Sequence, residues 1–542
     1  MNEDPIIVDN DKFFEGIIVG GGTCGLAIAS RLCESTPGSL YTDNEHQRFH
    51  WLKQRSFKSN KLGCKSCYHS SSFKSSDLLI IDQTSNKFIG QWDNQFNACQ
   101  IPFLRSPMFF HLDPLDIDGM ISYAHNSNRQ SELMEIQNVV GKEISKHKLK
   151  QKRGNKKPSG LIDINQRDWK DYYRPSTPLF HDYCESIVDR YNLRNSIIKD
   201  EVIDIKYKLL QYDENNIGKG FLIKTKFGQI FGCKFLVVAS GHKGKINYPI
   251  KPFKETKNTC HTTHLFTNQV KFLDDQFFKN PKSKKIVIVG GGLTSAQLAH
   301  VACNDPTVSQ VTLLFRSKIK IKHFDFHLDW VSKFKNFKKS IFYNLDSNEL
   351  KYKMINNARE GGSINPEYYK KLKIHLKQSG DKFKWFTETS IVESEWVDNH
   401  WNLKLSNDIE LKNIDYIYFA TGITADINSL NFLNSINKQY PIEIEQGFPV
   451  LTDNLQWNNE IPLFLIGKNA SLTIGPTSAN LDGARIGAER IGWYLQNMKL
   501  QGKFNWSIET TEEVQNNNDV FNTQLNLAGG NLNWYELLEC NA

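Results

Sequence analysis

Two glycine clusters in this chain have the residue types and spacing that bind phosphate groups. Each follows an apolar, β-branched run and precedes a run of small residues typical of a helix. The matching positions are Gly20, Gly22 and Gly25 in the first cluster, and Gly290, Gly292 and Ser295 in the second. Glycine lets the backbone turn tightly and lets a pyrophosphate approach, while the helix start offers free N–H groups and partial positive charge. The pattern predicts two dinucleotide sites, and a chain with two such sites typically passes a hydride between them; the alternative is two βαβ crossovers that bind no ligand.

An acidic residue is expected to mark the first site. Asp82 ends the apolar run 77–82, which we expect to be a strand, and an acid at such a position binds ribose hydroxyls. It follows the glycines by far more than the roughly 20 residues that are usual. We therefore predict a surface insertion over about 34–76, because lengthening a loop costs little entropy. Glu34 is the alternative acid, nearer in sequence but without a preceding strand.

A basic residue occupies the corresponding place at the second site. Arg316 ends the expected strand 310–316, where an NAD site has an acid. Together with Ser317 and Lys318 it offers positive charge and hydrogen-bond donors to a 2′-phosphate. This favours NADPH over NADH, with a solvated strand end as the alternative interpretation of Arg316.

The other residues that could do chemistry give weaker signals. Cys64 and Cys67 form a Cys-x-x-Cys pair, but no second pair completes a tetrahedral zinc site, and we predict no metal. Cys24, inside the first glycine cluster, is interpreted as a packed small residue. His261 and His264 lie near the start of the second module and are assigned no chemistry. No Ser-His-Asp order, HExxH or Walker loop is present, so no catalytic side chain is predicted.

Composition limits the class of protein. At 542 residues and 39% hydrophobic content, the chain can form two or three domains with sizeable cores. No apolar run approaches the roughly 20 residues of a membrane span, and the N-terminal residues do not resemble a signal peptide. The ten cysteines lack a framework spacing, which favours a reducing compartment. We therefore expect a cytoplasmic protein whose net charge of +8 suits anionic cofactors and gives no argument for nucleic acid.

The order of the expected strands indicates how the domains are arranged. Similar apolar runs ending in small residues, 235–241 and 416–422, lie on either side of the second glycine cluster. This predicts an α/β fold with two Rossmann-like domains, in which the second module is inserted into the first. The expected boundaries are 1–245 and 411–505 for the outer domain, 246–410 for the inserted one, and 506–542 for a tail. Between 318 and 396 we expect helices around 325–338 and 348–378, and a further helix from near 478 to 498.

A second insertion is expected at 142–157, which is rich in lysine. We interpret it as a solvated loop; the alternative is a nuclear-import or polyanion-binding tract.

This order of motifs resembles the two-dinucleotide-binding-domain flavoproteins. Within them it is most similar to the flavin-dependent monooxygenases, a group that includes the lysine and ornithine N-hydroxylases. The resemblance covers most of the chain except the two insertions and the last ~40 residues. It implies that the first glycine cluster and Asp82 hold FAD, and that the second cluster and Arg316 hold NADPH.

The resemblance also implies roles for residues outside the two clusters. Trp92 would lie beside the isoalloxazine ring, or else anchor the core. Arg105 would stabilise charge on reduced flavin, or else form an ion pair. Gly467 and Gly475 would belong to a third flavin segment, in which Lys468 replaces the aspartate that many relatives carry. Gly422 would lie in the connection about which the two modules pivot.

The function implied by the resemblance is an NADPH-dependent FAD oxidoreductase, a monooxygenase that uses O₂. A flavin C4a-(hydro)peroxide would pass oxygen to a small nucleophilic substrate, so the cofactor performs the difficult step. One alternative is an NADPH-acceptor flavoprotein reductase. Another is a non-catalytic regulatory protein that keeps the flavoprotein fold, as in the oxidative stress-induced growth inhibitor family. The segment 318–396 is where we expect substrate determinants, because it departs most from a bare nucleotide module.

Overall fold

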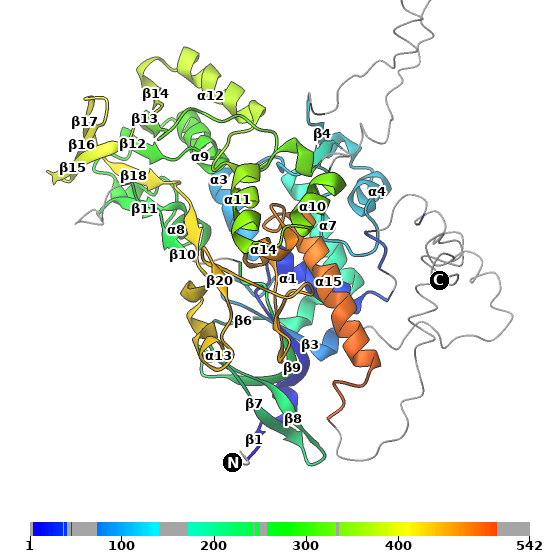
Figure 1. Cartoon of the computed structure of the whole chain (residues 1–542). Helices are drawn as coiled ribbons and strands as arrows, with labels where there is room; N and C mark the ends of the chain where they lie inside the picture. Colours follow the sequence, from blue (N-terminus) through cyan, green and yellow to red (C-terminus); the bar gives the residue numbers. More distant parts are fainter. Residues whose placement is uncertain are drawn as a thin grey trace, which may run out of the picture.

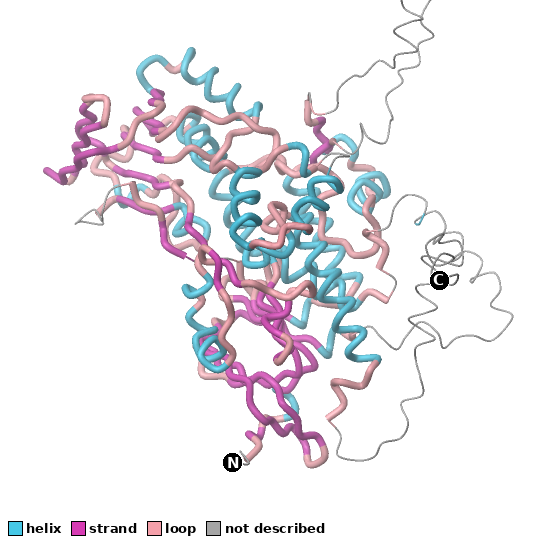
Figure 2. Tube along the Cα trace, in the orientation of Figure 1, coloured by secondary structure: helices cyan, strands magenta, loops and turns pink. Residues whose placement is uncertain are grey.

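The computed structural model describes residues 4–35, 37–40, 45, 73–137, 139, 172–241, 244–249, 257–331 and 335–506. Cys64, Cys67, the basic segment 142–157, most of 34–76 and nearly all of 506–542 lie outside the described residues. Figure 2 shows the strands in two groups, one at the upper left and one toward the bottom, with helices gathered between and beside them.

The larger group is a nine-stranded sheet with the main order β1-β7-β8-β9-β2-β3-β6. Its central strands β9, β2, β3 and β6 are parallel, and β23 extends the parallel set beside β9. A long antiparallel hairpin, β7–β8, forms one side and reaches the bottom of Figure 1. The bounds are β1 Ile6–Ile7, β2 Phe13–Val19, β3 Leu78–Asp82, β6 Ile197–Lys199, β7 Val202–Asp213, β8 Asn216–Thr225, β9 Ile230–Val238, β22 Gln456–Asn458 and β23 Ile461–Leu465.

The second group is a five-stranded, fully parallel sheet in the order β11-β18-β12-β13-β14. Its inner strands β18, β12 and β13 are short, mostly buried apolar runs, as parallel strands between helices must be. A three-stranded antiparallel sheet, β15-β16-β17, is attached to it. The bounds are β11 Thr259–His261, β12 Lys284–Val289, β13 Val308–Leu314, β14 Phe383–Phe386, β15 Ile391–Val397, β16 His400–Leu405, β17 Glu410–Ile414 and β18 Tyr416–Phe419.

The chain passes between the two sheets twice. It leaves the large sheet after β9, builds the second sheet from β11 to β18, and returns to the large sheet at β22 and β23. The two crossing segments pair with each other as β10 Gly244–Ile246 and β19 Ile423–Ala425. The remaining paired strands are β4 Leu133–Glu135 with β5 Tyr173–Pro175, and β20 Ile444–Glu445 with β21 Phe448–Pro449.

The helices pack on the sheets and between them. On the large sheet, α1 packs against α15, and on the second sheet α9 packs against α12. The bounds are α1 Thr23–Cys33, α3 Gly90–Cys99, α4 Gly119–Asn126, α7 Thr177–Arg190, α8 Thr262–Phe266, α9 Leu293–Asn304, α10 Lys335–Tyr343, α11 Asn348–Arg359, α12 Pro366–Gln378, α13 Asn434–Gln439, α14 Ser471–Ile474 and α15 Leu481–Leu500. None of the helices in the described part of the chain is long and apolar enough to cross a membrane.

The segment after β13 differs from the helices that the sequence predicts. The expected helix 348–378 is wrong as a single element, because it divides into α11 and α12. Glu360 and Gly361 adopt left-handed conformations that end α11, and Asn365 caps α12 just before Pro366. The expected helix 325–338 is also wrong over 325–331, where only a short 3-10 turn at Leu328–Trp330 forms.

This segment also joins the two modules. Phe324, Phe326 and Trp330 belong by sequence to the second module, yet they are buried in the core of the large sheet, as are Phe342 and Ile355 from α10 and α11. Figure 1 shows α10 and α11 in the middle of the molecule, above α1 and α15 in this view. The part of the chain expected to carry substrate determinants therefore packs at the junction of the modules.

Candidate cofactor sites

The first glycine turn joins β2 to the N-terminus of α1. Gly20 has a φ of +112°, and a Cβ there would lie 2.6 Å from the carbonyl oxygen of Ala239. A Cβ on Gly25 would lie 1.9 Å from the carbonyl oxygen of Gly20, so the helix could not pack against the turn. By contrast, a Cβ on Gly22 would meet no atom within 4 Å. Two glycines are thus required by the fold, while the third faces open space at the helix N-terminus.

Asp82 is held against this turn at the end of β3. Its carboxylate accepts hydrogen bonds from the backbone N–H of Gly21 (2.7 Å), Thr84 (2.8 Å) and Ser85 (3.0 Å). Glu34 follows the opposite end of α1, where it accepts a hydrogen bond from the Tyr191 hydroxyl at 2.6 Å. Because only Asp82 lies at the glycine turn, the geometry favours it over Glu34 as the ribose-binding acid.

The second glycine turn, between β12 and α9, is built in the same way. A Cβ on Gly290 would lie 2.4 Å from the carbonyl oxygen of Ala420. Ser295 is fully buried, and its hydroxyl donates to the carbonyl oxygens of Gly290 (2.9 Å) and Gly292 (2.7 Å). The serine that replaces the third glycine therefore stabilises the turn. Gly362 packs on this turn so closely that a Cβ on it would lie 3.0 Å from the Cα of Gly292.

Arg316 lies just beyond β13 and is exposed, as are Ser317 and Lys318. Its guanidinium forms no hydrogen bond or ion pair with any residue that the structure describes. It is therefore available to an anionic ligand at the edge of the second sheet.

Several buried polar atoms near the two turns have no partner among the described residues. They are Ser240 Oγ after β9, Thr421 Oγ1 after β18, and Nε2 of His261 at the end of β11. A buried polar group without a hydrogen bond is costly, and ligands of parallel α/β sheets bind beyond the carboxyl ends of the strands. The open space at Gly22 and these three atoms fit the binding of dinucleotides at both sheets.

Arg105 connects the two modules. Its guanidinium donates to the carbonyl oxygens of Lys322 (2.8 Å), His323 (2.8 Å) and Phe324 (2.8 Å), to the Ser363 hydroxyl (3.0 Å), and to Asp325 Oδ1 (2.6 Å). Burial would raise the pKa of Asp325, but Arg105 and Arg359 outweigh it and hold that pKa below its ordinary value. Arg105 therefore links the loop after α3 to the segment after β13.

Trp92 lies on α3, where its ring contacts Phe96 and Phe180 with centroid distances of 5.0 and 5.2 Å. The side chain is partly buried. These contacts agree with the core-anchor alternative, while a position beside a flavin ring stays a prediction.

The third predicted flavin segment lies against the first glycine turn. Gly467 follows β23 with a φ of +82°, and a Cβ on it would lie 3.1 Å from Sγ of Cys24 in the first turn of α1. The side-chain amide of Asn469 donates to the carbonyl oxygen of Gly241 at 3.2 Å. Gly475 ends α14 with a φ of +101°, and α15 begins at Leu481. The segment therefore contacts the first turn of α1 and the loop beyond β9.

Cys24 carries no signal of reactivity. Burial raises the pKa of its thiol to about 12, so the thiol stays protonated at neutral pH. This agrees with its interpretation as a packed small residue.

Sequence reasoning missed Arg359 and the buried charged residues Asp482 and Arg485 of α15. Arg359 ends α11 and donates to the carbonyl oxygen of Pro476 (3.1 Å) and to Asn480 Oδ1 (3.3 Å), which ties α11 to the third segment. Asp482 and Arg485 in the first turns of α15 are buried, and Arg485 donates to the carbonyl oxygen of Phe109 at 3.0 Å. No motif marks these residues, because each acquires its partners only when distant segments meet.

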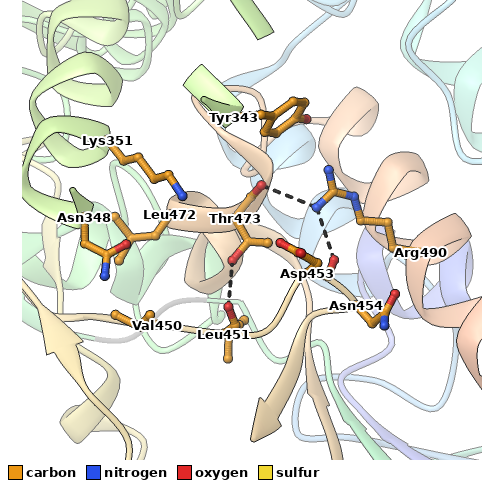
Figure 3. Close-up of a pocket in the computed structure, with 10 residues that line it drawn as sticks. All are labelled: Tyr343, Asn348, Lys351, Val450, Leu451, Asp453, Asn454, Leu472, Thr473 and Arg490. Carbon is orange, nitrogen blue, oxygen red and sulfur yellow. Dashed lines mark hydrogen bonds between the residues drawn. The ribbon is translucent and has the colours of Figure 1, made fainter. Parts of the chain in front are cut away.

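A separate pocket of about 470 Å³ opens between α10, α11 and the segment 450–454. Figure 3 shows Arg490 at its wall, donating to the carbonyl oxygens of Asp453 (3.2 Å) and Thr473 (3.5 Å). None of the glycine-turn residues lines this pocket, so we assign it no part in cofactor binding.

Comparisons with known proteins agree with this arrangement. Residues 172–425 match the family model of L-lysine 6-monooxygenase/L-ornithine 5-monooxygenase. The match begins just before β5 and ends with β19, so it covers the whole second sheet. No curated protein sequence matches the chain.

Solved structures share the fold over most of the chain. The reduced form of ornithine hydroxylase from Pseudomonas aeruginosa superposes with a TM-score of 0.58 at 13% identity, covering 90% of this chain and 99% of that one. The ornithine N-hydroxylase of Kutzneria sp. 744, in a complex with reduced FAD, NADP⁺ and L-ornithine, gives 0.58 at 11% identity, covering 90% and 100%. The L-lysine 6-monooxygenase of Pseudomonas syringae gives 0.53 at 13% identity, covering 89% and 99%.

The predicted α/β fold and the predicted resemblance are therefore confirmed. The chain has the fold of the two-dinucleotide-binding-domain flavin monooxygenases, and its residues 172–425 match the model of the L-lysine 6-monooxygenase/L-ornithine 5-monooxygenase family.

Proposed function

We propose that this protein is an FAD- and NADPH-dependent monooxygenase that hydroxylates an amine nitrogen of a small molecule. The observation that carries the proposal is the family match over 172–425, in a fold with a glycine turn after an interior parallel strand of each of two sheets. Oxidoreductase chemistry with FAD and NADP as cofactors agrees with the structural relatives, one of which is described with reduced FAD and NADP⁺ bound and another with FAD bound.

The first glycine turn would hold FAD. Gly22 leaves space for the pyrophosphate at the N-terminus of α1, and Asp82 lies where an acid binds the ribose. When bound, FAD supplies hydride acceptance and oxygen activation. Ser240 and the third segment from Gly467 would contact it from the neighbouring strand ends.

The second glycine turn would hold NADPH. Gly290, Gly292 and Ser295 form the turn, and Arg316 would pair with the 2′-phosphate. His261 and Thr421, whose buried polar atoms lack partners, lie at the strand ends of this sheet.

The protein's own residues bind the two cofactors, orient them and exclude water. The ion pair between Arg105 and Asp325 links the two modules on one side of their junction. Arg359 closes another by joining α11 to the third segment. Fixing both modules in this way restricts solvent access to the space between the two turns, where reactive intermediates need protection.

The substrate we propose is a primary amine. The structural relatives are named as hydroxylases or monooxygenases of ornithine, lysine and cadaverine, which all carry a terminal amino group. Nitrogen is nucleophilic only as the free amine, so we expect the rate to rise with pH as the substrate amine loses its proton.

The test uses the purified full chain with FAD and NADPH. Each of the three amines is added in turn, and oxygen uptake, NADPH oxidation and hydroxylamine product are measured together. Amine-dependent oxygen uptake with a stoichiometric hydroxylamine product supports the proposal. Oxygen-independent reduction of a quinone would instead indicate a reductase, and a protein that binds no FAD would indicate the non-catalytic alternative.

A further inference from the structure

The pocket between α10, α11 and the segment 450–454 has a volume of about 470 Å³ and lies apart from both glycine turns. A volume of this size is typical of sites that bind small molecules. One part of its rim is a tight turn, in which the N–H of Leu455 donates to the carbonyl oxygen of Thr452 at 2.9 Å. The Leu455 side chain is fully buried, and its φ is +63°. The fold therefore fixes this part of the rim in place.

Arg490 of α15 forms one wall of the pocket and is already oriented. Its Nη1 donates to the carbonyl oxygens of Asp453 (3.2 Å) and Thr473 (3.5 Å). Its guanidinium carbon lies 5.2 Å from the centroid of the Tyr343 ring. The other two guanidinium nitrogens, Nε and Nη2, have no hydrogen bond or ion pair with any described residue. Two donors of an oriented guanidinium are thus left for a ligand, and a carboxylate can accept from both.

Lys351 of α11 brings a second positive charge to the pocket. Figure 3 shows Leu472 and Thr473 of α14 between Lys351 and Arg490. The ammonium of Lys351 has no ion pair or hydrogen bond in the part of the chain that the structure describes. By contrast, Lys353, two residues further along the same helix, contacts Glu349 at 2.5 Å. Both cations of the pocket are therefore available to a ligand.

The lining also contains one carboxylate and an apolar surface. The backbone oxygen of Asp453 accepts from Arg490, but its side chain has no partner among the described residues. Asn348 and Asn454 add side-chain amides. The apolar lining residues are Val450, Leu451 and Leu472. The pocket thus offers two positive charges, one negative charge and a patch for a short hydrocarbon chain.

We propose that this pocket is a second small-molecule site, which binds a free α-amino acid with an aliphatic side chain. The carboxylate of the amino acid pairs with Arg490 and Lys351, its ammonium pairs with Asp453, and its side chain contacts the apolar patch. Other charge patterns fit less well, because Asp453 repels a phosphate or a dicarboxylate and the two cations repel a diamine. The site goes beyond the proposed function, since none of its residues belongs to a glycine turn.

The first test compares three ligands that share one hydrocarbon chain. Isothermal titration calorimetry of the purified full chain, without added cofactor, uses L-leucine, 4-methylpentanoate, which lacks the ammonium, and 3-methylbutylamine, which lacks the carboxylate. L-Leucine also lacks the terminal amino group that the proposed substrates share. We expect L-leucine to bind with a dissociation constant of about 1 mM or tighter. Each analogue should bind about tenfold more weakly, because it loses a charged hydrogen bond.

The second test removes the charges of the protein one at a time. Lys351→Met and Asp453→Asn should each weaken the binding of L-leucine by about tenfold. In Asp453→Asn, L-leucine should no longer bind more tightly than 4-methylpentanoate, because the acid that pairs with the ammonium is gone. Lys353→Met is the matched control and should bind L-leucine like the wild type, since Lys353 lies on the same helix but is 60% exposed and paired with Glu349.

A wild type without saturable binding of L-leucine overturns the proposal, as does an unchanged dissociation constant in both variants, which would place the ligand elsewhere. Weaker binding in only one variant would show that the ligand presents one charge here, and it would contradict the amino acid as occupant. These measurements need neither FAD nor NADPH, so their failure is distinguishable from a failure of the proposed function.

Discussion

At the scale of single residues, the two glycine turns differ in the charged side chain that lies near each. The first has Asp82 bound to the backbone of its turn, and the second has Arg316 free of partners among the described residues. Asp82 was predictable because an acid at the end of an apolar run is visible in sequence.

Arg316→Ala should reduce the preference for NADPH. Loss of a charged hydrogen-bond donor to the 2′-phosphate should weaken NADPH binding by about tenfold or more, while NADH, which lacks that phosphate, should bind as before. The measurement is the dissociation constant of each nucleotide for the wild type and the variant. An unchanged ratio between the two constants would show that Arg316 is a solvated strand end.

His111 should make the protein sensitive to acid. It is fully buried, one ring nitrogen lies 2.7 Å from the carbonyl oxygen of Ile117, and burial is the main cause that lowers its pKa to about 4. The unfolded chain therefore binds this proton at a higher pH than the folded one, with a pKa of about 6.5. Stability should be complete above about pH 6.5 and should fall as the pH drops toward 4.

The check is the urea midpoint of the wild type and His111→Gln between about pH 7 and about pH 4.5. The variant should lose less stability over this range, because glutamine can keep a donor to Ile117 without taking up a proton. His125→Gln, at an exposed histidine, is the control and should follow the wild type. Equal slopes for His111→Gln and the wild type would contradict the assignment.

At the scale of elements, the strand–turn–helix units were predictable because glycine spacing and apolar runs are local signals. The expected strand 77–82 is found as β3, and 310–316 as β13. The helices between β13 and β14 were predicted less well. Their register depends on Glu360, a non-glycine residue with a φ of +52° that ends α11, and on burial against a core formed by the other module. Neither cause is visible in the local sequence, so apolar periodicity alone predicted one helix where the structure has α11 and α12.

Substitutions at two glycines of the first turn should affect folding and FAD binding differently. Gly22→Ala places a methyl group in open space, so it should cost less than about 1 kcal/mol of stability but block the approach of a pyrophosphate and weaken FAD binding strongly. Gly25→Ala places a Cβ 1.9 Å from the carbonyl oxygen of Gly20 and should destabilise the fold by about 3 kcal/mol or more. Thermal unfolding without cofactor and FAD titration of both variants check this. If Gly22→Ala binds FAD like the wild type, the pyrophosphate does not lie at this turn.

At the scale of the whole molecule, the two sheets are joined by more than the paired crossing segments β10 and β19. The segment after β13 leaves the second sheet and inserts Phe324 and Phe326 into the core of the first. Arg105 then holds the same segment by hydrogen bonds from the opposite module. Because these contacts join the module of the second sheet to the core of the first, the molecule should unfold as a single cooperative unit.

Phe326→Ala should break this coupling. Phe326 is 1% exposed in the core of the large sheet, so its truncation should cost about 3–5 kcal/mol. Because the lost contacts are those that join the modules, calorimetry should show one transition for the wild type and two separated transitions for the variant. Phe337→Ala, in the same segment but 66% exposed, is the matched control and should change stability by less than about 0.5 kcal/mol while keeping one transition. A Phe326→Ala protein that melts in one transition at the wild-type temperature would show that the segment after β13 does not couple the two modules.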